Sequence, residues 1–304
     1  MTIVRGLSRV APASLCRWRR IVVATLAASA FAADAASFSH GRLFRVDRPG
    51  VSPSYVFGTL HSNDARVTAL PTPVTTALAA SRTAAFETLL LDADRAAFLA
   101  ASQTAHGLRL SDHVDTATFE RIARALEPQG IDRALLERAK PWAALLMLAQ
   151  GVDDGQASVD GELLARARAR GLSLVGLELP DEQVAALDGI PLESRLALVR
   201  WARDTQHDRK AQLETTTRAW LAGDLRRLKR QALEPPGSDP RLAAHFRSLY
   251  GKLITDRNVL MAHRLHLPLT RGRVFVAVGA LHLEGRNGLL ALIEAQGYRI
   301  TRVL

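Results

Sequence analysis

The sequence predicts an α/β fold, with a central, mostly parallel sheet, flanking helices and a helical insertion. Residues 54–57 and 274–278 are apolar runs rich in β-branched and aromatic side chains, which is typical of buried strands. The long centre of the chain carries helix caps and helical periodicity instead. Strands near both ends that enclose a helical centre favour one domain over residues 38–304, with the insertion at about 94–170 and 191–266.

The individual elements follow from turn residues, caps and periodicity. Two predicted strands at 42–46 and 54–57 flank Asp47-Arg48-Pro49-Gly50, a turn sequence that indicates a hairpin. Asp115 and Ser158 are placed as N-caps, and Pro141 as the first residue of a helix. The remaining predictions are helices at about 73–81, 192–221 and 287–296, and strands at 84–91, 172–179, 274–281 and 298–304.

Residues 1–32 have the pattern of a secretory signal. Five arginines precede the apolar stretch 21–32, which ends in the small-residue site Ala30-Phe31-Ala32. Twelve residues are fewer than the ~20 that a membrane-spanning helix needs, so cleavage is favoured over an anchor. We therefore expect a mature N-terminus between Ala33 and Ser37, a periplasmic or secreted location, and no stable membrane span after cleavage.

Removal of this segment changes what the composition implies about partners. The segment holds five arginines and no acidic residue, so the formal net charge falls from +10 to +5 and no longer argues for nucleic acid. The aromatic content of 5% also offers little surface for stacking bases. Cys16, the only cysteine, is removed as well, which excludes disulfides, a cysteine nucleophile and thiolate ligands in the mature chain.

The chain repeats one signature, Gly58-Thr59-Leu60-His61 and Gly279-Ala280-Leu281-His282, and each copy closes a predicted strand. Ligands of open α/β sheets bind at the C-terminal strand edge, so the two histidines predict one shared site. Glu87, alone within an apolar run, requires a cation, a metal or a proton. Two imidazoles and a carboxylate suit a divalent manganese, cobalt or zinc ion, which can activate a water for attack on a carbonyl.

The alternative role is structural: the histidines satisfy backbone groups at strand ends, and Glu87 pairs with an arginine. Each of the other candidate residues also has a functional and a structural interpretation. Asp160 and Glu178 either line the site or serve a helix N-terminus and an arginine. Arg257 either stabilises an oxyanion, orients Glu178, or closes the fold through an ion pair. His263 and His266 are assigned to a helix surface.

From about Leu43 to its C-terminus the chain resembles the TraB/GumN family, which is related to the Tiki metalloproteases and, more distantly, to heme-uptake and erythromycin-esterase-like proteins. The motifs that carry the resemblance are residues 57–61, Glu87, 140–142, 159–164, 176–178, Trp220 with Gly223 and Asp224, Arg257 with Asn258, and 278–285 with Gly288 and Leu289.

The resemblance implies a divalent-metal site, held by His61, His282 and Glu87, for hydrolysis of a peptide or a small ester. We further name Glu87, Glu178 and Arg257 as candidate catalytic residues. The candidate substrate-binding residues are Gly58, Gly279, Asp160 and Asn258. Where the family more often carries a second acid near Glu87, this chain offers only Asp92.

Two classes of function are therefore open. One is an exported metal-dependent hydrolase, with a peptidase as the favoured activity. The other is a non-catalytic periplasmic binding or accessory protein, for peptide sequestration or envelope polysaccharide export, that uses the same pocket for recognition only. The hydrolase is favoured because binding alone does not need two histidines and a buried acid.

Overall fold

A six-stranded mixed sheet forms the centre of the computed structural model, which describes residues 38–89, 91–104, 107, 109–149, 158–235 and 239–304. The strand order is β4-β3-β5-β2-β1-β6. In chain order the strands are β1 (Leu43–Arg48), β2 (Val51–Thr59), β3 (Thr83–Phe86), β4 (Ser173–Gly176), β5 (Val274–Gly279) and β6 (Arg299–Arg302). The neighbours β4, β3, β5 and β2 are parallel, and only β1 pairs antiparallel, with β2 and β6. The predicted α/β class with a mostly parallel sheet is thus confirmed.

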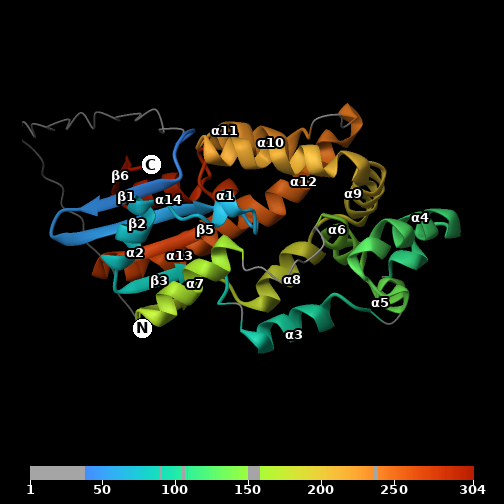
Figure 1. Ribbon diagram of the computed structural model, residues 1–304, viewed down its shortest axis with the longest axis horizontal. Coiled ribbons are helices and arrows are strands. Elements are labelled where there is room, and N and C mark those ends of the chain that lie inside the picture. The colour runs from blue at the N-terminus through green and yellow to red at the C-terminus, as the bar shows by residue number, and fades with distance from the viewer. Residues whose placement is uncertain (1–37, 90, 105–106, 108, 150–157, 236–238) are drawn as a thin grey trace, which may run out of the picture. The chain divides into compact units, whose positions relative to one another are not determined.

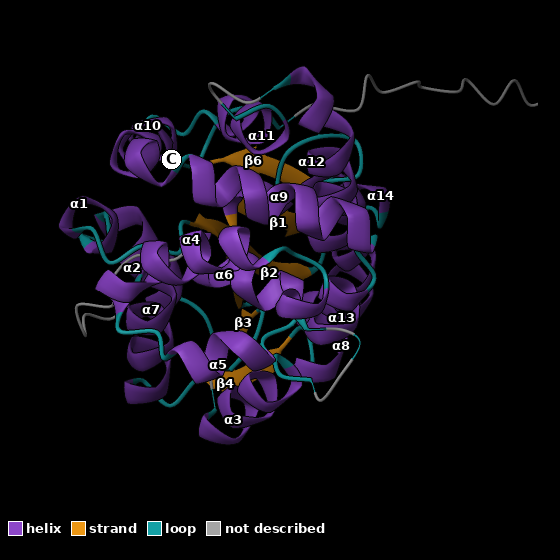
Figure 2. Cartoon of the chain, turned by 90° about the vertical axis from the view of Figure 1, so that its right-hand side faces the viewer, coloured by secondary structure: helices purple, strands orange, loops and turns teal. Residues whose placement is uncertain are grey.

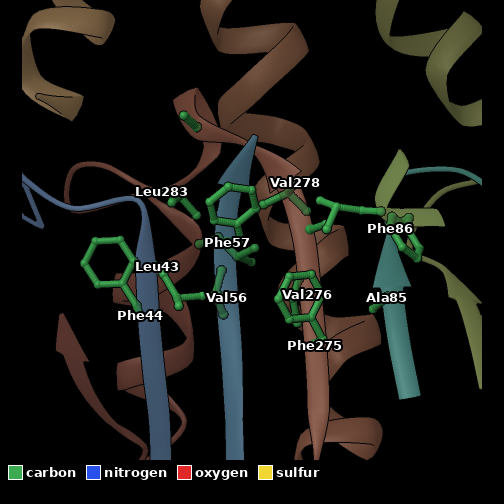
Figure 3. Packing of buried hydrophobic residues seen from close by; sticks show 14 of the residues in the cluster. Leu43, Phe44, Val56, Phe57, Ala85, Phe86, Phe275, Val276, Val278 and Leu283 are labelled. Carbon is green, nitrogen blue, oxygen red and sulfur yellow. The ribbon is translucent and has the colours of Figure 1, made fainter. Parts of the chain in front are cut away.

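The central strand forms where the sequence is apolar on both faces. β5 lies between β3 and β2, and all its residues are buried. Figure 3 shows Phe275 and Val276 of β5 beside Val56 and Phe57 of β2, with Phe86 on the other flank. The predicted hairpin joins β1 to β2, with a register shift between Val46 and Arg48.

Helices cover both faces of the sheet. Figure 2 shows α2 and α7 on one side and α13 and α14 on the other. The predicted caps form, since Asp115 and Ser158 accept hydrogen bonds from the backbone N–H groups of Thr118 and Gly161. The helices are α1 (Ala65–Thr68), α2 (Thr72–Ala79), α3 (Asp92–Ala101), α4 (Thr116–Leu126), α5 (Arg133–Arg138), α6 (Pro141–Ala149), α7 (Val159–Ala169), α8 (Pro180–Asp188), α9 (Leu192–Asp204), α10 (Arg209–Leu221), α11 (Leu225–Leu233), α12 (Ala243–Tyr250), α13 (Asp256–Arg271) and α14 (Leu289–Ala295).

The buried apolar residues form two separate clusters. The first surrounds the sheet and includes residues of α7, α11, α13 and α14. The second is purely helical, is built around Trp142, and draws on α4, α6 and α9 together with Phe246 of α12. In Figure 1 the helices α4, α5, α6 and α9 lie to the right of the sheet, beyond the ends of the parallel strands. The C-terminal strand edge therefore faces the helical part of the protein.

Several predicted elements have different boundaries, and the strands expected at 172–179 and 274–281 end early, at Gly176 and Gly279. The helix expected at 192–221 is two helices, α9 and α10, separated by a 3₁₀ turn at Gln206–Asp208. The side chains of Thr205 and Gln206 bond the carbonyls of Trp201 and Ala202 and so end α9. The strand expected at 84–91 ends at Phe86, which leaves Glu87 beyond the pleat.

Short or weakly periodic helices were not predicted, namely α1, α3, α5, α8 and α11. A π turn, Gly251–Thr255, joins α12 to α13 and brings Arg257 and Asn258 directly after it. Within the described residues, no helix is long and apolar enough to cross a membrane. The signal segment 1–32 and the expected cleavage region lie outside the described residues.

Candidate functional site

Four adjacent parallel strands each deliver a polar side chain to the same edge of the sheet. His61 follows β2, Glu87 follows β3, Glu178 follows β4 and His282 follows β5. Because parallel strands end side by side, residues far apart in sequence meet beyond their carboxyl ends. The histidines of the two Gly-x-x-His motifs are neighbours for this reason.

His61, His282 and Glu87 converge on one point. The Nε2 atoms of His61 and His282 lie 3.9 and 3.7 Å from Glu87 Oε1. The same oxygen accepts a hydrogen bond of 2.7 Å from the backbone N–H of Gly279. A Cβ on Gly279 would lie 3.3 Å from Glu87 Oε1 and 3.5 Å from His61 Nε2. Glycine at this position therefore leaves the space between the three side chains open.

Both imidazoles are held through their other nitrogen. His61 Nδ1 lies 2.8 Å from Asp160 Oδ2, and His282 Nδ1 lies 2.7 Å from Asn258 Oδ1. The Asn258 amide nitrogen donates to the Asn287 carbonyl, so its oxygen is the atom that faces His282. Since both partners are acceptors, Nδ1 carries a proton in each ring, and Nε2 is the atom that faces Glu87.

Arg257 joins Glu87 to the buried Glu178. Its Nη2 donates to Glu87 Oε2 at 2.8 Å, and its Nε donates to Glu178 Oε1 at 2.7 Å, with a second contact from Nη2 to Glu178 Oε2. Glu178 is 4% exposed, so its charge depends on this guanidinium. Two carboxylates share one arginine, which leaves one negative charge unbalanced among these three groups and favours a cation.

The pKa values follow from this arrangement. Burial would raise the pKa of Glu87, but the charges of His282, His61 and Arg257 outweigh it and lower the pKa to about 2. Burial lowers the pKa of His282 to about 4, against the pull of Glu87. For His61, desolvation is outweighed by the charges of Asp160 and Glu87, which raise the pKa to about 9. Its side chain is 64% exposed, so solvent screens part of that pull.

The donor chemistry fits a divalent metal, although the spacing is wider than that of a filled site. In the part of the chain that the structure describes, no group of three His, Cys, Asp or Glu side chains is arranged to hold an ion as it stands. Ligands ~2.1 Å from a tetrahedral ion are about 3.4 Å apart. The separations of 3.7 and 3.9 Å from Glu87 to the histidines exceed this by a few tenths of an ångström.

The structure shows the contacts of several residues expected at the substrate. Asn258, expected at the substrate, is 2% exposed, and both atoms of its amide are engaged by His282 and Asn287. Asp160 likewise positions His61 rather than offering a free carboxylate. Gly58 is a packing position, because a Cβ there would lie 2.7 Å from Leu283 Cδ1.

Glu178 and Arg257 form the ion pair that the sequence left open as an alternative to a catalytic role. Asp92 is exposed in the first turn of α3 and does not supply a second acid beside Glu87. His263 is exposed on α13, as assigned.

One contributor was missed. Thr59 Oγ1 donates to Asp160 Oδ1 at 2.7 Å and fixes the carboxylate that holds His61. The signal was present, because Thr59 lies two residues before His61 at a strand end, where alternate residues share a face.

These features define a class of α/β protein. Its sheet is mostly parallel, and a polar site with two Gly-x-x-His histidines and a glutamate lies at the C-terminal edge of the strands. The chain belongs to the TraB/PrgY/gumN family, whose model matches residues 43–302.

Two curated relatives carry the same description, "Uncharacterized protein YbaP". The protein from Shigella flexneri is 25% identical over 257 residues, which is 81% of this chain and 89% of the relative. The protein from Escherichia coli K12 is 26% identical over 191 residues, 61% of this chain and 68% of the relative. No solved structure shows a significant match.

Proposed function

We propose that this protein is an exported metal-dependent hydrolase that cleaves peptides at the site formed by His61, His282 and Glu87. The observation that carries the proposal is the orientation of the two imidazoles. Each ring is held through Nδ1 by an acceptor, and each Nε2 points to the same carboxylate oxygen over a glycine. A purely structural histidine does not require this shared orientation.

Each residue has a defined task in this proposal. His61, His282 and Glu87 hold a manganese, cobalt or zinc ion, which when bound supplies a polarised carbonyl and an activated water. Asp160 and Asn258 accept the Nδ1 hydrogen bond of each histidine, so that Nε2 is the atom aimed at the ion. Both groups are positioning residues.

Arg257 keeps Glu87 ionised and ties it to the buried Glu178. Its remaining nitrogen, Nη1, is held by the carbonyl of Leu253, so the guanidinium is rigid. Arg257 is therefore a positioning residue that acts through Glu87. In this proposal the protein acts on peptides and has no nucleic-acid partner.

The test combines metal analysis with a cleavage assay. Wild type and the variants His61→Ala, His282→Ala and His263→Ala are stripped with a chelator and reloaded with manganese, cobalt or zinc. We expect the first two variants to lose metal retention and cleavage of a peptide library, since each lacks one ligand. His263→Ala removes an exposed imidazole from α13 and should behave as wild type.

Glu87→Gln provides a second arm, because it keeps the shape of the side chain and removes its charge. We expect it to be nearly as damaging to metal retention as the histidine variants. Metal-independent peptide binding without cleavage under any of these ions, unaffected by His61→Ala and His282→Ala, would instead support the binding or accessory protein.

A further inference from the structure

We propose that the cavity between α3, α6 and α8 is a specificity pocket that receives a large apolar side chain of the substrate, beside the bond that is cut. This inference rests on the proposed peptide hydrolysis and adds the substrate feature that the site selects. The cavity has a volume of about 430 Å³, at the lower end of the range for small-molecule sites.

The cavity adjoins the site through two residues. Thr88, which directly follows Glu87, lines the cavity, and so does Gln183. The Gln183 side-chain nitrogen lies 3.4 Å from Glu178 Oε2, on the carboxylate that Arg257 connects to Glu87. A peptide whose carbonyl lies at Glu87 and the two histidines therefore has this cavity within reach of a neighbouring side chain.

The cavity wall is apolar and is not closed by the protein itself. Helix α3 has no buried residue, although Phe98 and Leu99 line the cavity from that helix. Phe98 stacks at a tilt on Trp142, with ring centroids 5.5 Å apart, and Met147 completes this wall. An apolar helix face that meets a cavity instead of a core leaves hydrophobic surface for a ligand to cover.

Two polar groups of the wall, on Ser102 and Trp142, already donate to acceptors of the protein. The Ser102 hydroxyl donates to the Leu99 carbonyl at 2.6 Å, so its proton is used. The Trp142 Nε1 donates to Asp188, which orients the ring. Asp94 and Arg95, of opposite charge, lie in the first turns of α3. The unbranched Met147 can adapt to side chains of different shape.

The wall therefore selects for apolar bulk. Burial of a leucine or phenylalanine side chain corresponds to a preference of at least about tenfold over glycine.

The experiment measures binding of capped single amino acids to the full, metal-free chain, so that its outcome does not depend on catalysis. The probes are N-acetyl-phenylalaninamide, N-acetyl-leucinamide, N-acetyl-aspartamide and N-acetyl-glycinamide, and binding is followed by saturation-transfer NMR titration. The test variant is Leu99→Trp, which fills the cavity from a side chain that is 54% exposed. The matched control is Leu267→Trp on α13, at 58% exposure and away from this cavity.

We expect wild type and Leu267→Trp to bind the phenylalanine and leucine probes at least about tenfold more tightly than the glycine and aspartate probes. Leu99→Trp should lose this preference while its unfolding midpoint stays near that of wild type. Equal binding of all four probes, or an unchanged preference in Leu99→Trp, would overturn the pocket.

Library cleavage separates this outcome from the proposed function. Cleavage without preference for an apolar neighbour would overturn the specificity pocket and support the hydrolase. Selective probe binding without cleavage would support the pocket and overturn the hydrolase.

Discussion

The two glycines of the repeated Gly-x-x-His motif should respond to alanine in opposite ways. At Gly279 the added Cβ would lie 3.3 Å from Glu87 Oε1 and 3.5 Å from His61 Nε2, with no backbone contact among its nearest neighbours. At Gly58 the Cβ would lie 2.7 Å from Leu283 Cδ1 and 3.1 Å from the Cα of Ala280. The methyl group of Gly279→Ala enters the space between the proposed ligands, and that of Gly58→Ala meets the packed residues Ala280 and Leu283.

The magnitudes follow from these distances. Gly279→Ala gains roughly 0.4–1 kcal/mol from the lower entropy of the unfolded chain, and the tight contact with Glu87 offsets part of this gain. Its free energy of unfolding should therefore stay within about 1 kcal/mol of wild type. Metal affinity should fall about 10–100-fold, as for other disturbances of a ligand shell. Gly58→Ala should lose about 1–3 kcal/mol of stability through overpacking and keep its ligands.

The assay is a pair of measurements on each variant. Urea unfolding gives stability, and titration of the stripped protein with manganese, cobalt or zinc gives affinity. The reasoning fails if Gly279→Ala binds metal as wild type does, because the space over Gly279 would then have no part in binding. It also fails if Gly58→Ala is as stable as wild type.

Three further predictions concern charge and export. Burial lowers the pKa of His282 in the folded chain to about 4, below its ordinary value of 6.5. The unfolded chain therefore binds a proton first as pH falls. The free energy of unfolding should drop by about 3 kcal/mol between pH 6.5 and 4. His282→Gln should flatten this part of the pH profile of urea unfolding, and an unchanged slope would contradict the assignment. Arg257→Met leaves Glu178, whose side chain is 0% exposed, without its charge partner, so the free energy of unfolding should fall by about 3–5 kcal/mol. Adding Glu178→Gln should restore part of this stability. If it restores none, the lost charge pairing is not the cause. Mass spectrometry of the exported protein should find an N-terminus between Ala33 and Ser37, and an intact arginine-rich start would exclude cleavage.

Much of the fold could be predicted because its signals are local. The apolar runs that became β2 and β5, the hairpin turn, and the caps Asp115 and Ser158 depend on residues near one another in the chain. The break between α9 and α10 was missed, because α9 joins the helical cluster and α10 the sheet cluster through Trp220. Periodicity alone does not show that two halves of one amphipathic stretch pack on different partners.

For the site, the sequence by itself determined that His61 and His282 stand at strand ends. It predicted Glu87 inside a strand, and only the structure, in which β3 ends at Phe86, places Glu87 at the same edge. The Gly-x-x-His motif is short, and the residues that follow the last residue of a strand lie at the edge of the sheet. Only the tertiary structure decided what surrounds them. Asp160 and Asn258 come from α7 and α13, distant in sequence, and their roles depend on which nitrogen of each histidine they meet. Such contacts arise from the packing of helices on the sheet, which no spacing along the chain encodes.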